Sequence, residues 1–240
     1  MTALEVQAVT VRFGGNIALQ AVDLTAEPGC ITGLIGPNGA GKTTLFNVIT
    51  GLQPPASGRV SINGRDVTRL PPYKRARVGL ARTFQRLELF SLLSVRGNVR
   101  VAAHAARRRD RSIDVERLTD ELLERVGLRS LADVRVDELP TGQARLVELA
   151  RSLAGKPAVL LLDEPASGQD ETETSAFADL LHVLAADGMA VVLVEHDVRL
   201  VMRTCALVYV LDFGEVLAAG PPDAIQRDQR VIEAYLGATA

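Results

Sequence analysis

Short apolar runs alternate along this chain with longer stretches of mixed apolar and polar residues. Residues 31–35, 159–163 and 190–195 are compact apolar segments, each with the length of a buried strand. The stretch 171–186, between the last two, shows the pattern of a helix. A strand, a helix and a second strand in that order imply a parallel sheet covered by helices, so the pattern predicts an α/β fold.

Other segments predict antiparallel strands. Residues 4–13 and 18–26 have strand patterns and are joined by a turn at Gly14-Gly15. Residues 58–64 predict a further strand that ends in an Asn-Gly turn, and residues 206–219 predict a hairpin around Asp212-Phe213-Gly214. The chain should therefore contain a mixed sheet and a separate antiparallel part.

A helical region interrupts the strands. A short helix is expected from Pro71-Pro72 to about Val78, and from Ser94 to about Leu131 the pattern becomes helical. Ser94 can cap the first of these helices, and Gly127 can end the last. A further helix is expected over residues 145–153. We interpret the stretch as a helical lobe inserted into the α/β core.

The segment from Gly36 to Thr44 carries the clearest chemical signal. It fits the pattern G-x-x-x-x-G-K-[ST], with a predicted strand before it and a predicted helix after it. Its glycines let successive N–H groups point at an anion, and the helix N-terminus adds positive potential. Lys42 can contact the β- and γ-phosphates, and the Thr43 hydroxyl can ligate Mg²⁺. The motif predicts nucleoside triphosphate binding by Gly36, Pro37, Asn38, Gly39, Ala40, Gly41, Lys42, Thr43 and Thr44.

Paired acids follow a second apolar strand. Asp163 and Glu164 end the run that begins at Ala158, so the strand should carry them to the sheet edge where ligands bind in α/β folds. Asp163 is expected to hold Mg²⁺, directly or through a water molecule. Glu164 is expected to act as the general base toward the attacking water.

Composition narrows the functional classes. The chain has 240 residues, a net charge of -2 and a 47% hydrophobic content, which together argue for a sizeable core and against nucleic-acid binding. Of the 27 basic residues only Lys42, Lys74 and Lys156 are lysine. A compact ammonium group therefore stands in the phosphate loop of a chain that otherwise uses arginine.

The remaining composition bears on location. Cys30 and Cys205 lack C-x-x-C spacing, so we expect buried free thiols in a reducing compartment. The first residues lack the pattern of a signal peptide, and the apolar runs are too short to cross a bilayer. We expect membrane contact only through a partner.

With these motifs in order, the chain resembles over essentially its whole length the nucleotide-binding subunit of an ABC transporter. Leu139-Pro140-Thr141-Gly142-Gln143 stands in the place of the family's L-S-G-G-Q signature, just upstream of the Asp163 strand. The resemblance assigns ATP and Mg²⁺ as cofactors. It also implies that Phe13 stacks on adenine, that Gln85 senses Mg²⁺ and that His196 contacts the γ-phosphate. Thr141, Gly142 and Gln143 would contact the ATP bound to the opposite subunit, and Asp170 would lie at the dimer interface.

Finer features resemble one branch of the family. The stretch 79–85, the Glu195-His196-Asp197 sequence and the ending 231–237 look like the ATPase subunits of branched-chain amino-acid importers. Sister systems for amides, urea and other polar solutes look much alike, so the solute stays open. A non-transport ABC ATPase and a P-loop kinase are alternatives. The first usually carries long insertions or a second nucleotide-binding domain, and the second would carry no signature helix.

The signature departs from the family pattern. Pro140 and Thr141 replace its serine and first glycine. Proline has neither a hydroxyl nor an N–H group, so the phosphate contact must weaken or shift to Thr141 and Gly142. The effect on activity stays open, although it favours one less active site in a heterodimer.

The resemblance also implies an architecture and partners. It implies one nucleotide-binding domain over 1–240, with a core and β subdomain over about 1–93 and 156–240 and a helical signature subdomain over about 94–155. Two such domains would bind two ATP molecules between them, as a homodimer or with a second ATPase subunit. Expected partners are transmembrane permease subunits, which would hold this protein on the cytoplasmic face of the cell membrane, and, indirectly, a periplasmic or extracellular solute-binding protein. Import rather than export rests on the resemblance alone.

Overall fold

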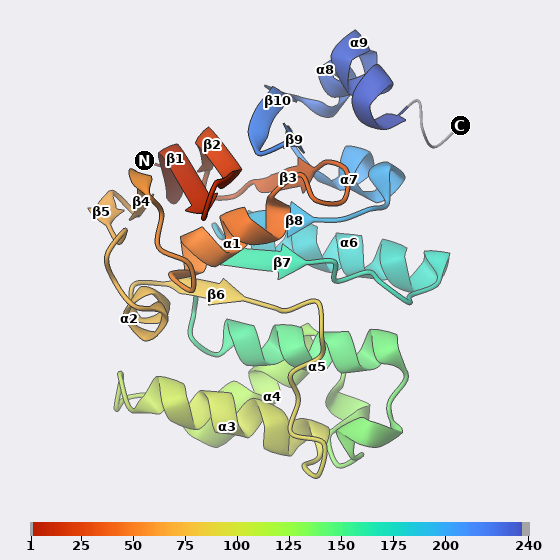
Figure 1. Ribbon diagram of the computed structural model, residues 1–240. Coiled ribbons are helices and arrows are strands. Elements are labelled where there is room, and N and C mark those ends of the chain that lie inside the picture. The colour runs from red at the N-terminus through yellow and green to blue at the C-terminus, as the bar shows by residue number, and fades with distance from the viewer. Residues whose placement is uncertain (1, 237–240) are drawn as a thin grey trace.

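Two sheets and a group of helices make up the computed structural model, which describes residues 2–236 (Figure 1). The larger sheet has six strands in the order β10-β9-β3-β8-β7-β6. Its strands are β3 (Ile31–Ile35), β6 (Leu80–Arg82), β7 (Val159–Asp163), β8 (Ala190–Val194), β9 (Leu207–Asp212) and β10 (Glu215–Gly220). All neighbours are parallel except β9 and β10, which are antiparallel, so the predicted mixed α/β sheet is confirmed.

Both faces of this sheet are buried, which explains its continuous apolar strands. Leu160 and Leu162 of β7 pack with α6 (Glu171–Ala186) and α7 (Val198–Thr204) on one face. The alternate residue Leu161 packs with α1 (Lys42–Thr50) on the other. The parallel strands consequently end beside the loops that begin these helices, and this is the edge where ligands bind in such folds.

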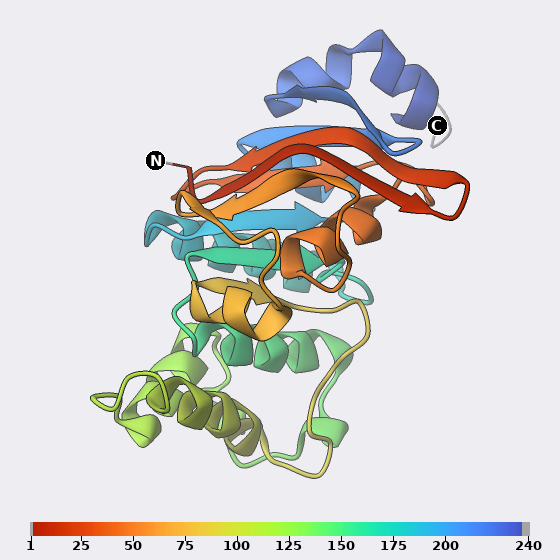
Figure 2. The same ribbon diagram turned by 60° about the vertical axis from the view of Figure 1, so that its left-hand side comes forward.

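The second sheet is antiparallel and covers α1 (Figure 2). Its order is β2-β1-β4-β5, with β1 (Leu4–Phe13), β2 (Asn16–Ala26), β4 (Ser57–Ile62) and β5 (Arg65–Asp66). β2 begins two residues before the predicted residue 18. Phe13 pairs directly with Asn16, because Gly14 adopts a φ of 59° and closes a two-residue turn.

Helices lie in a layer beyond β6, at the bottom of Figure 1. They are α3 (Val95–Arg107), α4 (Val115–Arg125) and α5 (Thr141–Leu153), with short 3₁₀ turns η1 (Arg129–Leu131) and η2 (Val136–Glu138). α2 (Pro72–Arg77) precedes β6. The Ser94 side chain accepts a hydrogen bond from the Gly97 N–H, as expected of a cap, and Gly127 follows α4 with a φ of 74°.

The beginning of α5 differs from the sequence expectation. The helix starts at Thr141 rather than Arg145, with Pro140 in an extended conformation at the N-cap position. Proline ends the preceding segment without needing an N–H partner, so the helix can form directly after it. Thr141, Gly142 and Gln143 therefore form the first turn of α5 and not a loop before it.

The last described elements are α8 (Pro222–Arg227), α9 (Gln229–Val231) and the π-helical turn η3 (Ile232–Leu236), and Gly237 of the predicted C-terminal motif lies outside the described residues. Both cysteines are free thiols; Cys205 is buried and Cys30 is half-buried. Within residues 2–236, no helix combines the length and the apolar character that crossing a membrane requires.

Candidate functional site

The loop from Gly36 to Thr44 lies between β3 and α1, as the phosphate-loop motif requires. Gly36 has a φ of 149°, and a Cβ at this position would overlap the carbonyl oxygen of Leu211 on the neighbouring β9. No side chain caps α1. The N–H groups of its first turn consequently face the loop without an internal partner, which is suitable for binding an anion.

Lys42 closes the loop on itself. Its ammonium donates hydrogen bonds to the carbonyl oxygens of Gly36 at 2.6 Å and Pro37 at 3.0 Å. Burial lowers the pKa of Lys42, while the nearby carboxylates of Glu164 and Asp163 raise it. Those opposing influences place the cation within electrostatic reach of both acids. The ammonium is thus held where the curled loop meets the acidic strand end.

Glu164 has a backbone conformation that few non-glycine residues adopt. Its φ is 51°, and its N–H donates to the carbonyl oxygen of Val194 at 2.9 Å. Non-glycine residues in this region store strain that surrounding structure must hold. Only 16% of the Glu164 side chain is exposed.

Two side chains distant in sequence hold the Glu164 carboxylate. Its Oε1 lies 2.7 Å from Nε2 of His196, and its Oε2 accepts a hydrogen bond from the Gln85 amide at 2.9 Å. His196 follows β8 and Gln85 follows β6, so three neighbouring strands supply one residue each. A carboxylate fixed in this way can orient a water molecule and accept its proton.

Asp163 is buried at the end of β7, 5% exposed. Its Oδ2 accepts a hydrogen bond from Arg82 Nη2 at 2.8 Å. No other hydrogen bond within residues 2–236 engages this carboxylate, so Oδ1 remains available. Arg82 itself was not predicted as a site residue; a cation in a short strand just before Gln85 is the signal that could have identified it.

Glu195 is a second residue that sequence reasoning missed. It is 4% exposed, and its two oxygens accept N–H hydrogen bonds from Ala166 at 2.7 Å and from His196 at 3.3 Å. Burial raises the pKa of this carboxyl to about 7; the two N–H bonds lower it, Glu164 raises it and His196 lowers it. Its position in the sequence between Val194 and His196 does not predict that the side chain is buried. Glu195 joins the loop after Glu164 to the loop that carries His196.

The signature residues and Asp170 lie together in a different place. Thr141 approaches Gly168, and a Cβ on Gly142 would lie 2.9 Å from the carboxylate of Glu173. Asp170 caps α6 by accepting the Glu173 N–H at 2.8 Å. No hydrogen bond in the described chain connects these residues with the phosphate loop. One chain therefore presents two separate surfaces.

The signature helix is tied to the segment around Gln85. Arg145 of α5 donates to the carbonyl oxygens of Phe84, at 2.7 Å, and of Gln85. Glu148 lies beside it and accepts the Phe84 N–H at 3.3 Å. Burial raises the pKa of Glu148, and the Phe84 N–H and Arg145 lower it. This buried pair therefore fixes the backbone of Phe84 and Gln85 to helix α5 through hydrogen bonds.

The donor set suits magnesium. Asp163 offers a carboxylate oxygen, Thr43 an exposed hydroxyl at the start of α1, and Gln85 an amide oxygen whose nitrogen is already used. These are hard oxygen donors of the kind that Mg²⁺ prefers. Among the described residues no group of three or more His, Cys, Asp and Glu could bind a metal ion. Water and substrate phosphate would complete a magnesium site, as is usual for this ion.

Phe13 ends β1 with 52% of its surface exposed. An exposed ring can offer one face to a planar base. The structure contains no contact that fixes this ring against another aromatic group within the described residues. Its assigned role in adenine binding therefore remains a prediction.

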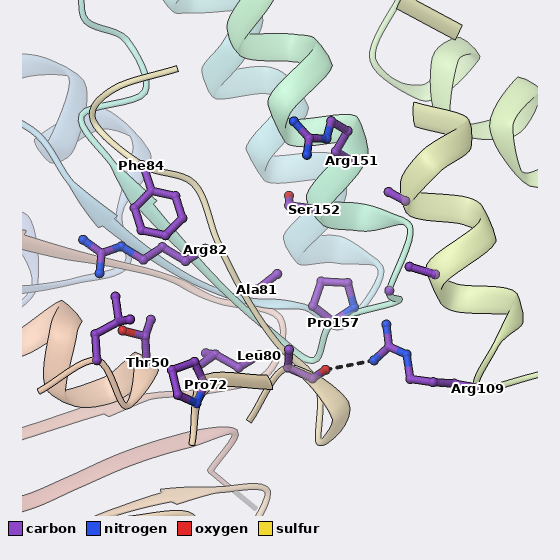
Figure 3. A pocket seen from close by; sticks show the side chains of 15 residues that line it. Thr50, Pro72, Leu80, Ala81, Arg82, Phe84, Arg109, Arg151, Ser152 and Pro157 are labelled. Carbon is purple, nitrogen blue, oxygen red and sulfur yellow. Dashed lines mark hydrogen bonds between the residues drawn. The ribbon is translucent and has the colours of Figure 1, made fainter. Parts of the chain in front are cut away.

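A groove of about 370 Å³ lies between β6 and the helical layer (Figure 3). Arg82 and Phe84 form one wall and Arg151 of α5 another, with Pro157 between α5 and β7. Arg109 crosses one end and donates to the Ala76 carbonyl oxygen at 3.1 Å. Phe84, which precedes Gln85 in the chain, lines this groove, whereas no residue of the 36–44 loop does.

Comparison with known families identifies two matching regions. The ABC transporter family model matches residues 19–167, which is more than half of the chain. A second model, described as branched-chain amino acid ATP-binding cassette transporter, matches residues 215–240.

Similar proteins and structures agree with these matches. The chain is 38% identical to the high-affinity branched-chain amino acid transport ATP-binding protein BraF of Pseudomonas aeruginosa, covering 98% of this chain and 97% of that protein. It is 34% identical to the lipopolysaccharide export system ATP-binding protein LptB of Escherichia coli, covering 99% and 98%. The crystal structure of MJ1267, an ATP-binding cassette of an ABC transporter, superposes with a TM-score of 0.88 at 27% identity, covering 98% of this chain and 99% of that one.

Proposed function

This chain belongs to the ABC transporter family, whose ATP-binding subunits hydrolyse ATP to drive transport, and from that premise we propose that it powers an importer of branched-chain or related amino acids. Support for the solute class comes from the C-terminal match over residues 215–240 and from the 38% identity to BraF. An ATPase for another small solute, such as an amide or urea, is the alternative. A non-transport ABC ATPase is less well supported.

One observation carries the catalytic proposal, namely the Glu164 carboxylate held between Gln85 and His196. We assign Glu164 as the general base. It accepts a proton from water as the water oxygen attacks the γ-phosphorus, and the bond to the β-phosphate oxygen breaks. His196 contacts the γ-phosphate oxygens, and Gln85 helps to orient the water and the metal. Positioning and charge stabilisation account for most of the rate in such reactions.

The other site residues bind the nucleotide. The loop N–H groups and Lys42 hold the β- and γ-phosphates, and Phe13 stacks on adenine. Thr43, Gln85 and Asp163 would hold Mg²⁺, which when bound neutralises charge on the phosphate oxygens. The ammonium of Lys42 would exchange its hydrogen bonds to Gly36 and Pro37 for phosphate oxygens, a stronger charge-assisted pairing.

The separation of the signature from the phosphate loop is the reason to propose a dimer. We assign residues of about 1–93 and 156–240 to the core and β subdomain and about 94–155 to the helical subdomain. ATP bound by one subunit would be covered by Thr141, Gly142 and Gln143 of a second. A solved relative, the bacterial ABC transporter cassette MJ0796, is described as dimeric. The second subunit is either another copy or a different ATPase.

The groove beside Gln85 is the proposed site of permease contact. Phe84 lines the groove and is 40% exposed, and the ring of Phe90, 46% exposed, lies 4.8 Å from the guanidinium of the lining residue Arg151. Leu92, 80% exposed, follows two residues later in the chain. Apolar side chains gathered at a groove are typical of a docking surface for a helix. A permease segment here would place the protein on the cytoplasmic face of the membrane, and a solute-binding protein would act indirectly on the far side.

Affinity capture tests the proposed function. Tagged Glu164→Gln protein should recover polytopic membrane proteins and a second ATPase from detergent-solubilised membranes in the presence of MgATP. The same protein without nucleotide is the control for ATP-dependent closure. Recovery of soluble or nucleic-acid-bound partners alone would contradict transport and favour the non-transport class.

A further inference from the structure

Arg82 lies at the junction of three functional segments. Its Nη2 donates to Asp163 Oδ2 at 2.8 Å, and its Nη1 donates to Asn47 Oδ1 of α1 at 2.7 Å. The guanidinium carbon lies 5.4 Å from the Phe46 ring centroid and 4.9 Å from that of Phe84. The side chain is only 6% exposed. It thus connects the phosphate-loop helix, the Asp163 strand and the wall of the groove.

The Arg82 guanidinium hydrogen-bonds only one of the two oxygens of the Asp163 carboxylate. Oδ2 is engaged, whereas Oδ1 has no hydrogen-bond partner within residues 2–236. A planar guanidinium anchored at its other nitrogen by Asn47 leaves the carboxylate little freedom to rotate. Partner groups of this kind commonly orient the residues that bind a metal ion.

A purely structural role explains this arrangement poorly. The space around the guanidinium is formed partly by two aromatic rings, and Arg82 Nε is buried without a hydrogen-bond partner. Burying a charge is costly even where a carboxylate neutralises it, as Asp163 does here, and an apolar side chain of similar length would fill the same space but leave the Asp163 carboxylate unpaired. The charge and the fork are therefore explained by the two acceptors that they reach, Asp163 Oδ2 and Asn47 Oδ1, rather than by filling of space.

We propose that Arg82 is a positioning residue that holds the Asp163 carboxylate with Oδ1 presented to Mg²⁺, and that the Phe84 ring keeps Arg82 in place. This inference rests on the proposed role of Asp163 as a magnesium ligand. Phe84 also lines the groove, as Figure 3 shows beside Arg82. The metal site and the groove wall are then joined through one side chain.

The test measures the Mg²⁺ requirement of nucleotide binding, without hydrolysis. Binding of a fluorescent ATP analogue to the full chain is titrated with Mg²⁺, and urea unfolding of the nucleotide-free protein is recorded alongside. Arg82→Met should raise the half-saturating Mg²⁺ concentration roughly tenfold, as loss of a group that orients a metal ligand does. Affinity in EDTA should change less than about twofold.

Matched variants separate positioning from other effects. Arg82→Lys keeps the charge without the fork, so it should rescue only part of the shift. Phe84→Leu should give a smaller shift in the same direction. Arg96→Met breaks an ion pair with Asp120 in the helical layer and should leave the Mg²⁺ requirement unchanged.

The single variants distinguish the two possible failures, and the double variant supplies the criterion for support. If Asp163→Asn leaves the Mg²⁺ requirement unchanged, the proposed role of Asp163 is wrong. If Asp163→Asn raises it but Arg82→Met lowers it or has no effect, Arg82 acts only by repelling the cation or by packing, and the inference is overturned. Support requires that Arg82→Met adds no further shift in the Asp163→Asn background.

Discussion

Glu164 and His196 are 32 positions apart in sequence, yet Oε1 of the first lies 2.7 Å from Nε2 of the second. The other oxygen of the same carboxylate is held by Gln85, which is 79 positions away. Parallel strands bring these residues to one edge of the sheet. The contact restrains a carboxylate whose backbone is already in a rare conformation, with φ at 51°.

Substitution of the proposed base should separate binding from chemistry. Glu164→Gln keeps the size and a hydrogen-bonding oxygen but cannot accept the proton. ATP affinity should stay within a few-fold, and kcat should fall by about 10² or more. Phosphate release and analogue binding measure the two quantities. Glu116→Gln on α4 is the matched control, and near-normal turnover by Glu164→Gln would show that another group is the base.

Removal of the loop lysine should weaken binding. Lys42→Ala loses a charge-assisted contact with phosphate, so the Kd for ATP should rise roughly tenfold or more. Lys74→Ala is the matched control, because Lys74 is exposed on α2. Equilibrium titration of both variants gives the comparison. Equal affinities in the two would exclude Lys42 from phosphate binding.

Arg75 should matter for folding rather than catalysis. Its side chain is buried, 1% exposed, and donates to the carbonyl oxygens of Val48, at 2.6 Å, and Ile49, at 2.8 Å, in the last turn of α1. It also donates to the carbonyl oxygens of Leu70 and Thr68. Burial lowers the pKa of Arg75, and Asp66 raises it.

Arg75→Met would leave these acceptors unpaired and should reduce the free energy of unfolding by about 2–4 kcal/mol. Urea unfolding provides the measurement. Arg77→Met, at an exposed position of the same helix, should change it by less than about 0.5 kcal/mol. Equal midpoints for the two variants would contradict the capping role of Arg75.

Glu195 should make stability depend on pH. Its pKa is raised to about 7 by burial, whereas the same group in the unfolded chain titrates near 4.5. Between those values the folded state binds more protons than the unfolded state, so the free energy of unfolding falls as pH rises. The stabilisation from the raised pKa of Glu195 is fully present below the unfolded-state pKa of 4.5 and is lost as the pH rises through the folded-state pKa of about 7.

Glu195→Gln cannot ionise, so its unfolding free energy should lack this fall between pH 5 and 8. The difference between the wild type and the variant should change by a few kcal/mol at most across about that range. Urea midpoints at the two ends of the range test this. If the unfolding free energies of the wild type and of Glu195→Gln changed with pH in parallel, the pKa of the buried carboxyl would not be raised by folding.

Local signals in the chain sufficed for the presence of the main helices and strands and for the order of the motifs, but not for every element boundary. The helix at 171–186 and the strand at 159–163 have the predicted bounds, because periodicity and flanking residues are local properties. The first four residues of α5 were missed, although Pro140 directly before Thr141 is itself a local signal for a helix start. Neighbouring residues do not show, however, that Gly142 of α5 lies against Glu173 of α6.

The sequence by itself determined the α/β class, the family and the residues proposed to bind phosphate, because each depends on short patterns and their spacing. Only the tertiary structure decided which of these residues meet. It placed the Glu164 carboxylate between Gln85 and His196. It also packed the Arg82 guanidinium against the rings of Phe46 and Phe84 and paired it with Asp163. The physical reason is that such contacts arise from strand order and burial, which join residues far apart along the chain.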